Sequence, residues 1–218
     1  MTSREFRSRL TERARRAAVS VSTEVADQLE AYYRLLSRWN ASISLTSLQL
    51  ESLGDETVDR LLIEPLAAAR YVADVTANWF DLGSGGGSPA IPLKILRPAT
   101  KLVMIESKAR KAAFLREALR VLNLHDAEVE NERFEAVAAR MPGMAQIVTV
   151  RAVRSDAALF AATATLLVEG GRMLWFNSGH RLAKVPAVFR PLGTLPLSGS
   201  PVGKMVLLER VFHVEQTG

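Results

Sequence analysis

The sequence predicts an α/β protein in which helices cover both faces of a mostly parallel sheet. From Trp79 onward, short apolar runs alternate with stretches of helical periodicity, and this alternation is typical of parallel sheets. The part from Pro186 to Val214 has Gly, Pro and Ser turns and contains the apolar run KMVLLERVF, which predicts a closing antiparallel pair. We therefore expect seven strands, with an antiparallel strand at the C-terminal end.

The strands and helices of this part follow from the apolar pattern. Runs of strand length predict strands near 79–82, 101–106, 127–131, 146–151 and 172–176. Helical periodicity between these runs predicts helices over 91–97, 108–122, 134–140 and 155–168.

Residues 1–75 have a helical pattern instead. Apolar residues lie on one stripe and arginines on the other over 4–18, and 22–40 shows an apolar stripe more clearly. Ser22 or Thr23 is placed to cap the second helix, and 55–72 returns to a helical pattern. Because no linker follows, we expect these helices to pack on the sheet. The chain is thus predicted to form a single domain, 1–218, with a helical extension (1–75) and an α/β core (76–218).

The composition excludes several classes of protein. The chain has 218 residues, 48% of them hydrophobic and 23% charged, as in an ordinary globular domain. It has no cysteine and only three scattered histidines, so we expect no disulfide, no metal site and a reducing compartment. No apolar run approaches the roughly 20 residues of a membrane span, and the charged N-terminus lacks the apolar core of a signal peptide. We expect a cytoplasmic monomer with no membrane partner.

Basic residues are concentrated in two segments. Residues 1–20 contain six Arg or Lys against two acids, and 94–120 contain eight against two, although the net charge of the chain is only +5. Such segments on a mildly acidic body predict contacts with a polyanion such as nucleic acid. The alternative is that they are ordinary solvated helix faces.

A glycine-rich stretch follows the first predicted strand. The segment WFDLGSGGGSPAIPL has four glycines among the five residues from Gly83 to Gly87, which indicates backbone geometry that a Cβ would forbid. N–H groups at the start of the following helix can hold an anionic or polar ligand. In open α/β sheets such a ligand lies beyond the carboxyl ends of the strands.

An acidic residue ends the next predicted strand. Glu106 lies 23 residues after Gly83, where an acid can accept hydrogen bonds from both ribose hydroxyls. Loop and acid together predict an adenosine-containing cofactor, whereas the alternative is a structural turn with an exposed glutamate. No Lys-Ser or Lys-Thr pair follows the glycines, so the loop is not a P-loop, and Ser88 replaces the third glycine of a dinucleotide motif. Asp81, directly before the loop, suits the positive groups of S-adenosylmethionine, which favours methyl transfer over a nicotinamide dehydrogenase.

The ordered motifs resemble one family. DLGSGGGSPAIPL, IESKARKAAFL, ERFEA and VTVRAV resemble the ribosomal RNA small-subunit methyltransferase G family (RsmG/GidB). Upstream, LLSRWNASISLTS resembles its W-N-x-x-x-N-L-T segment, and RLLIEPLAAARYV resembles its R-H-I-x-D-S-L helix. The resemblance runs from about Tyr32 to Phe176. It implies a Rossmann-like S-adenosylmethionine-dependent methyltransferase fold and methylation of a guanine N7 in 16S ribosomal RNA of the small subunit.

The resemblance also implies roles for individual residues. Gly83, Gly85 and Ser88 would line the methionine side of the cofactor, and Glu106 would hold the ribose. Phe134 and Glu135 would border the adenine, while Arg151 would lie beside both the cofactor and the incoming base. With Asp81, these are the expected cofactor-binding residues. The chain departs from the family pattern at Ser44 (Asn), Leu61 (His), Glu64-Pro65 (Asp-Ser), Ala90 (Gly) and Asn177 (Lys).

The proposed chemistry requires little from the side chains. Guanine N7 is a lone-pair acceptor without a proton to lose, so its methylation needs positioning and no general base. Arg151 is the expected catalytic residue, because its guanidinium can hold O6 or a phosphate through two bonds. The alternative role is that of a structural arginine at a strand end.

RNA contacts are expected from the two basic segments. The candidates are Arg4, Arg7, Arg9, Arg13, Arg15, Arg16, Lys108, Arg110 and Lys111. Trp39 is expected in the core and Asn40 at a helix end. Two other functions stay open: methylation of another substrate by the same fold, and a non-catalytic, cofactor-sensing RNA-binding or ribosome assembly factor.

Overall fold

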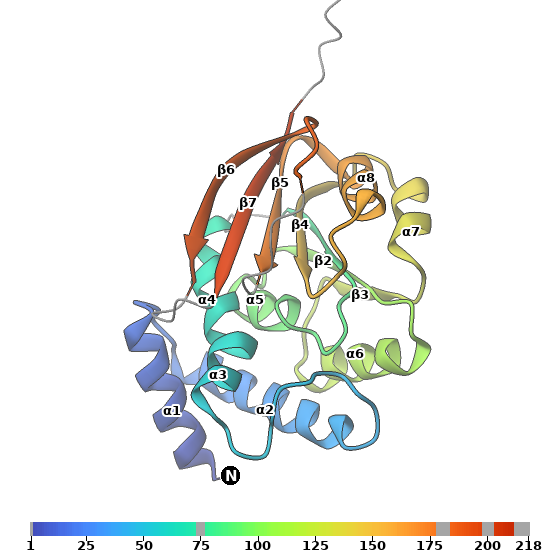
Figure 1. Cartoon of the computed structure of the whole chain (residues 1–218). Coiled ribbons are helices and arrows are strands. Elements are labelled where there is room, and N and C mark those ends of the chain that lie inside the picture. Colours follow the sequence, from blue (N-terminus) through green and yellow to red (C-terminus); the bar gives the residue numbers. More distant parts are fainter. Residues whose placement is uncertain (1, 73–76, 178–183, 198–202, 212–218) are drawn as a thin grey trace, which may run out of the picture.

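The computed structural model describes residues 2–72, 77–177, 184–197 and 203–211. Seven strands form one sheet in the order β3-β2-β1-β4-β5-β7-β6 (Figure 1). Their bounds are β1 Asn78–Leu82, β2 Lys101–Ile105, β3 Ala127–Glu130, β4 Ala145–Arg151, β5 Leu167–Asn177, β6 Phe189–Pro196 and β7 Lys204–Arg210. The first five strands are parallel, and β7 runs antiparallel to both β5 and β6. The predicted fold class is therefore confirmed; residues 198–202 and 212–214 of the predicted tail lie outside the described residues.

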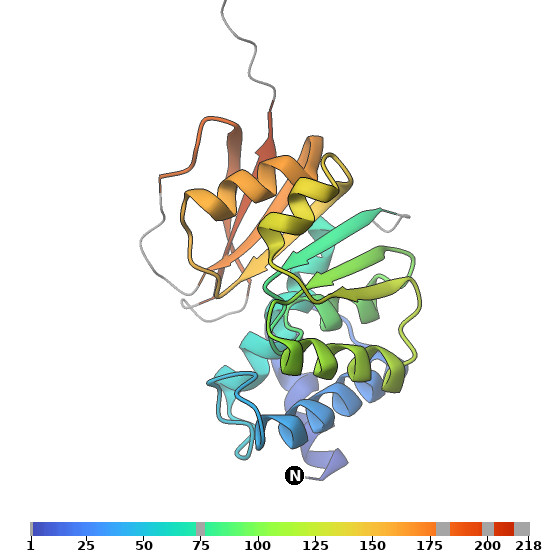
Figure 2. The same cartoon turned by 90° about the vertical axis from the view of Figure 1, so that its right-hand side faces the viewer.

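Helices cover both faces of the sheet (Figures 1 and 2). The crossovers carry α5 Ala90–Leu96, α6 Ala109–Val121, α7 Phe134–Arg140 and α8 Ala157–Leu166. Neighbouring strand residues point to opposite faces. Trp79 and Ile147 join the core cluster under α5 and α6, whereas Phe80 and Val148 join the cluster under α7 and α8. The alternation thus divides the interior into two apolar layers.

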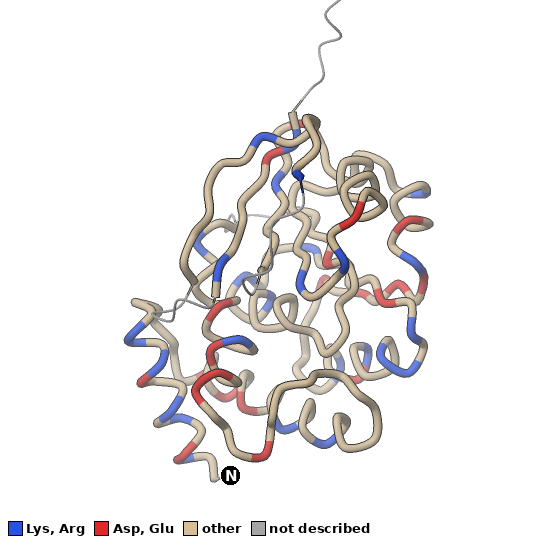
Figure 3. The backbone as a smooth tube through the Cα atoms, in the orientation of Figure 1, with Lys and Arg blue, Asp and Glu red and all other residues tan. Residues whose placement is uncertain are grey.

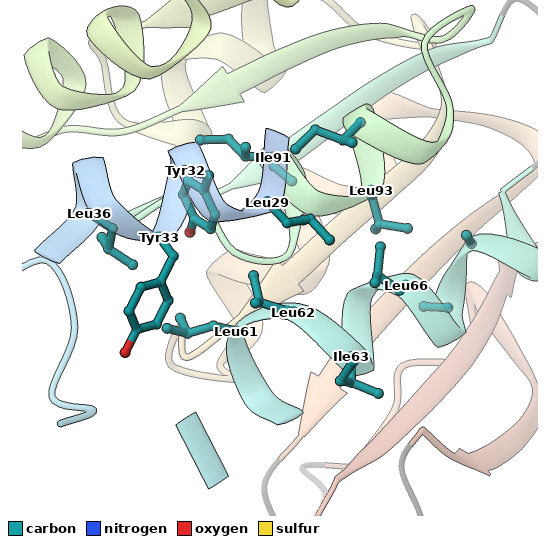
Figure 4. Packing of buried hydrophobic residues seen from close by; sticks show 14 of the residues in the cluster. Leu29, Tyr32, Tyr33, Leu36, Leu61, Leu62, Ile63, Leu66, Ile91 and Leu93 are labelled. Carbon is teal, nitrogen blue, oxygen red and sulfur yellow. The ribbon is translucent and has the colours of Figure 1, made fainter. Parts of the chain in front are cut away.

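The N-terminal helices share the first of these layers. They are α1 Ser3–Arg16, begun by a capping box of Thr2 and Glu5, and α2 Thr23–Asn40, capped by Ser22. Figure 4 shows leucines and tyrosines of α2 facing apolar side chains of 61–66 and α5. Because this cluster also contains Phe6 of α1 and Trp79 of the sheet, the predicted packing of these helices on the α/β core is confirmed.

Two segments differ from the helices that the sequence predicts. Residues 55–71 form four short pieces, α3 Asp55–Val58, the π-helical turn η1 Asp59–Ile63, α4 Glu64–Ala68 and the 3₁₀ turn η2 Ala69–Tyr71. Pro65 lies inside this run, where it cannot donate a helical hydrogen bond and its ring crowds the carbonyl four residues earlier. The helix expected over 155–168 ends at Leu166, because the chain extends into β5 from Leu167.

Candidate functional site

The glycine loop connects β1 to α5 at the carboxyl ends of the parallel strands. The N–H groups of Gly83 and Ser84 donate to the carbonyl of Ile105 at 2.9 and 3.1 Å, which ties the loop to β2. Gly83 has φ +72°, and a Cβ there would lie 2.6 Å from Cγ2 of Val153. Only glycine fits this backbone conformation and spacing.

Two adjoining cavities open beside this loop. The larger, of 270 Å³, is lined by Leu45, Thr46, Ser47, Leu48, Arg60, Leu61, Gly83, Ser84, Gly85, Gly86, Ser88, Glu106, Lys111, Arg151 and Ala152. The smaller, of 210 Å³, is lined by Gly83, Ile105, Glu106, Ser107, Glu132, Arg133, Phe134, Glu135 and Val153. Gly83 and Glu106 belong to both. Together the two cavities fall in the size range of small-molecule sites.

Glu106 lies where the two cavities meet. Its side chain accepts hydrogen bonds from the N–H of Gly85 at 3.0 Å and from the N–H of Lys108 at 2.8 Å. These two amides hold the carboxylate at the end of β2, and the residue is only 7% exposed. Because each carboxylate oxygen can accept more than one hydrogen bond, the group can also accept from two neighbouring hydroxyls.

Asp81 is buried behind the glycine loop rather than in the cavity wall. It is 1% exposed, and its carboxylate accepts a hydrogen bond from Thr149 Oγ1. Thr149 Oγ1 in turn accepts from the indole N–H of Trp79 at 2.8 Å. Burial raises the pKa of Asp81 to about 6, so a negative charge is held here at a cost in stability.

Arg151 lies at the end of β4 in a network of acceptors. It donates to Glu64 at 2.6 Å, to Ser88 Oγ at 3.3 Å and to the carbonyl of Arg60. Its guanidinium lies over the ring of Phe176, 4.6 Å from the centroid. Burial raises the pKa of Glu64, although the Arg151 charge opposes that rise.

Another part of the wall of the larger cavity comes from residues 45–48, to which the sequence motifs assigned no role in the site. Residues 45–48 face the loop, and Asn40, the last residue of α2, accepts hydrogen bonds from the N–H groups of Leu45 and Thr46 at 2.9 and 3.0 Å. The carbonyl of Leu45 comes so close to Gly86 that a Cβ on Gly86 would lie 3.2 Å away. The signal in the sequence was Asn40, whose amide folds this segment over the cavity.

Phe134 and Glu135 line the smaller cavity at the start of α7. Glu135 is paired with Arg133 at 3.0 Å, and this pairing lowers the pKa of Glu135. Tyr32 supports the loop from the other side, because its hydroxyl donates to the carbonyl of Gly86 at 2.7 Å. The structure therefore gathers every expected cofactor residue around one hollow, with Asp81 behind the wall.

The basic segments are not brought together. Lys108 and Arg110 are exposed at the start of α6, and Lys111 lines the larger cavity. The basic residues of α1 lie on the other side of α2 (Figure 3).

Ion pairs neutralise much of α1. Arg7 pairs with Asp27, Arg9 with Asp55, and Arg16 with Glu12. Arg13 is 9% exposed, and its Nε and Nη2 donate to the two carboxylate oxygens of Asp59. The expectation of an RNA contact at Arg13 is wrong, because its guanidinium is buried against Asp59. Charge counting missed this, since the acids come from distant segments.

Within the described ranges, no cluster of three or more His, Asp or Glu side chains could hold a metal ion. Among the helices of that part of the chain, none is both long and apolar enough for a bilayer crossing. The site instead offers a backbone cradle, a carboxylate between two cavities and a guanidinium at one end. This arrangement can bind a nucleoside and position a second reactant.

Solved structures share this architecture. A mutant of MtNAS in complex with S-adenosylmethionine matches with a TM-score of 0.60 and 13% identity, over 97% of this chain and 93% of that one. P. horikoshii TYW2 in complex with MeSAdo matches with a TM-score of 0.54 and 17% identity, over 68% and 61%. The strand order, the loop after β1 and the acid after β2 define a Rossmann-like fold with a candidate nucleoside site at the carboxyl ends of its parallel strands.

Sequence comparison identifies the family. Residues 25–186 match the family model GidB, rRNA small subunit methyltransferase G. A "Ribosomal RNA small subunit methyltransferase G" of Xanthomonas campestris pv. campestris (strain B100) is 37% identical over 183 residues, covering 83% of each chain. One of Stenotrophomonas maltophilia (strain K279a) is 34% identical over 185 residues, covering 84% of each. The chain belongs to the rRNA small subunit methyltransferase G family, as its motifs indicated.

Proposed function

We propose that the chain transfers a methyl group from S-adenosylmethionine to N7 of a guanine in 16S ribosomal RNA. The observation that carries this proposal is Glu106, fixed by two backbone amides where the two cavities meet beside the glycine loop. Family membership supplies the substrate class.

The residues present fit the cofactor. Gly83, Gly85 and Ser88 would hold its methionine side, Glu106 its ribose, and Phe134 with Glu135 its adenine. The test of this fit is the Glu106 carboxylate, which two backbone amides hold where the cavities meet and which can still accept from two hydroxyls. Bound there, the cofactor supplies an electrophilic methyl group. The Asp81 carboxylate lies behind the loop and favours a positively charged ligand.

Positioning carries the catalysis, because guanine N7 has a lone pair and loses no proton. Arg151 would hold O6 or a neighbouring phosphate beside the cavity, and its fork geometry suits such acceptors better than lysine does. The backbone directly after Arg151 is strained, because Ala152 has φ +55°, a conformation that costs a non-glycine residue about 1 kcal/mol or more. Such strain is typical of functional sites and supports a role for Arg151 there.

RNA would approach along the start of α6. Lys108 and Arg110 are exposed there, and Lys111 lies at the cavity. On α1, Arg4 and Arg15 are exposed, whereas Arg7 and Arg16 would have to exchange their acidic partners for phosphates. Such contacts set affinity and salt dependence rather than sequence preference.

We further propose that residues 1–218 act as one domain, a monomer that works in the cytoplasm. The apolar layer shared by α1, α2 and the sheet supports the single domain.

Incubation of the purified chain with labelled S-adenosylmethionine and undermethylated small-subunit RNA or particles tests the proposal. We expect label in the RNA and more product than enzyme. Product that never exceeds the enzyme would instead indicate a cofactor-sensing assembly factor, and label only outside RNA would indicate another substrate. Calorimetric titration should show binding of S-adenosylhomocysteine and none of NADH.

A further inference from the structure

The π-turn η1 frees two backbone carbonyls beside the cavity. In an α-helix the N–H of Glu64 would bond to the carbonyl of Arg60, but here it bonds one residue further back, to Asp59. The next N–H is missing, because Pro65 has none, and the proline ring crowds the carbonyl of Leu61. Neither the Arg60 nor the Leu61 carbonyl therefore has its helical partner.

Both carbonyls accept hydrogen bonds from the site instead. Ser88 Oγ, at the end of the glycine loop, donates to the carbonyl of Leu61 at 2.9 Å. The guanidinium of Arg151 donates to the carbonyl of Arg60. Arg60 and Leu61 themselves line the larger cavity, so the turn joins the cofactor loop to Arg151.

Glu64 completes this arrangement. Its carboxylate accepts from Arg151 at 2.6 Å, and side-chain exposure is 8% for Glu64 and 12% for Arg151. The carboxylate packs against the backbone of Gly203, where a Cβ would lie 2.2 Å from Glu64 Oε1. With a carboxylate and a carbonyl on its edge and a ring on its face, the guanidinium has one orientation.

The turn is held from its other side by α1. Arg13 Nε donates to Asp59 at 2.8 Å, and its Nη2 contacts the second oxygen of the same carboxylate. Asp59 is the residue whose carbonyl accepts the π-type bond from Glu64. The helical extension thus braces the segment that carries Glu64.

We propose that Glu64, set in place by the π-turn over 59–63, is the positioning residue for Arg151 at the cavity wall. This inference rests on the proposed function, in which Arg151 holds the incoming base or phosphate. It gives a role to Glu64 and Pro65, a pair at which the chain departs from its family pattern: Glu64 orients Arg151, and Pro65 lacks the N–H that would bond to the Leu61 carbonyl.

The central variant is Glu64→Gln, which keeps the shape of the side chain and removes the charge that orients Arg151. Loss of such a supporting partner lowers turnover about 10- to 100-fold. We expect this loss in kcat at saturating S-adenosylmethionine, with the Kd for S-adenosylhomocysteine within about 3-fold of the unaltered value, because the cofactor contacts remain. In an Arg151→Ala background, Glu64→Gln should change kcat less than about 2-fold, since it acts through Arg151.

Gly203→Ala gives an independent perturbation, because its Cβ would displace the Glu64 carboxylate without changing any charge. We expect the same selective loss of kcat, and this variant decides the question if Glu64→Gln fails to fold. Gly54→Ala is the matched control, since its Cβ would lie 3.8 Å from the nearest atom, Ser52 Oγ. Unchanged kcat in a folded Glu64→Gln or Gly203→Ala protein, or an equal loss of cofactor affinity, overturns the positioning role. No turnover by the unaltered protein overturns the proposed function as well.

Discussion

Asp81 offers a test that separates stability from cofactor binding. Its carboxylate is 1% exposed and accepts a hydrogen bond from Thr149. Asn has nearly the same shape and keeps an oxygen acceptor for Thr149, but it carries no charge. Asp81→Asn therefore removes the buried charge and little else.

The magnitude follows from the pKa of Asp81. Burial raises that pKa to about 6, whereas an aspartate in an unfolded chain titrates near 3.9. The folded state thus binds the proton more tightly, so this stabilising contribution is complete below about pH 4 and is lost as the pH rises through 6. Asp81→Asn should raise the free energy of unfolding by about 3 kcal/mol at pH 7.5 and by about 1 kcal/mol at pH 4.5.

Urea unfolding of the ligand-free protein at both pH values measures this difference. Asp27→Asn is the control, because the Asp27 side chain is 52% exposed and its loss should change stability by less than about 0.5 kcal/mol. In calorimetry, Asp81→Asn should weaken binding of S-adenosylmethionine more than that of S-adenosylhomocysteine, which lacks the sulfonium charge. Destabilisation by Asp81→Asn at pH 7.5 would contradict a costly buried charge at Asp81, and equal losses for both ligands would show that this charge does not favour the sulfonium.

Three further changes probe other parts of the molecule. Glu106→Gln should raise the Kd for S-adenosylhomocysteine about 10-fold or more in calorimetry, because an amide nitrogen cannot accept from a backbone N–H or a ribose hydroxyl. Unaltered affinity would show that Glu106 does not bind the ribose. Arg13→Ala should lower the free energy of unfolding by about 3 to 5 kcal/mol, since it leaves Asp59 buried and unpaired. Its control is the exposed Arg15, where Arg15→Ala should change the free energy of unfolding by less than about 0.5 kcal/mol. Similar urea midpoints for the two variants would contradict the buried pair. Arg110→Ala should weaken RNA binding and reduce the salt slope, plotted as log K against log salt, by about 1, with cofactor affinity unchanged; an identical slope would move the RNA path away from α6.

The strand and helix order could be predicted because it rests on local patterns. Alternating apolar residues place Trp79 and Phe80 on opposite faces, and the structure divides its two apolar layers in this way. The glycine loop and Glu106 are also local signals. Positive φ values favour glycines, which are visible in the sequence, and Glu106 ends a predicted strand. These local signals were sufficient to predict residues that line the two cavities.

The remaining parts of the site depend on contacts between distant segments. Nothing near Arg13 in the sequence indicates that Asp59 neutralises it. The wall over 45–48 depends on how Asn40 folds its own backbone. Pro65 was visible as a departure from the family pattern, but its consequence, a turn that offers one carbonyl to Arg151 and another to Ser88, requires the tertiary structure.

The identity of the methylated nucleoside is the most direct test of guanine N7 methylation by this chain. Small-subunit RNA treated with the chain and labelled S-adenosylmethionine is digested with nuclease, and the modified nucleoside is located by mass spectrometry. We expect 7-methylguanosine at a single site, with its yield lowered sharply by Arg151→Ala in a protein that still binds S-adenosylhomocysteine. A methyl group on another atom or base, or undiminished yield from the folded Arg151→Ala variant, would contradict it.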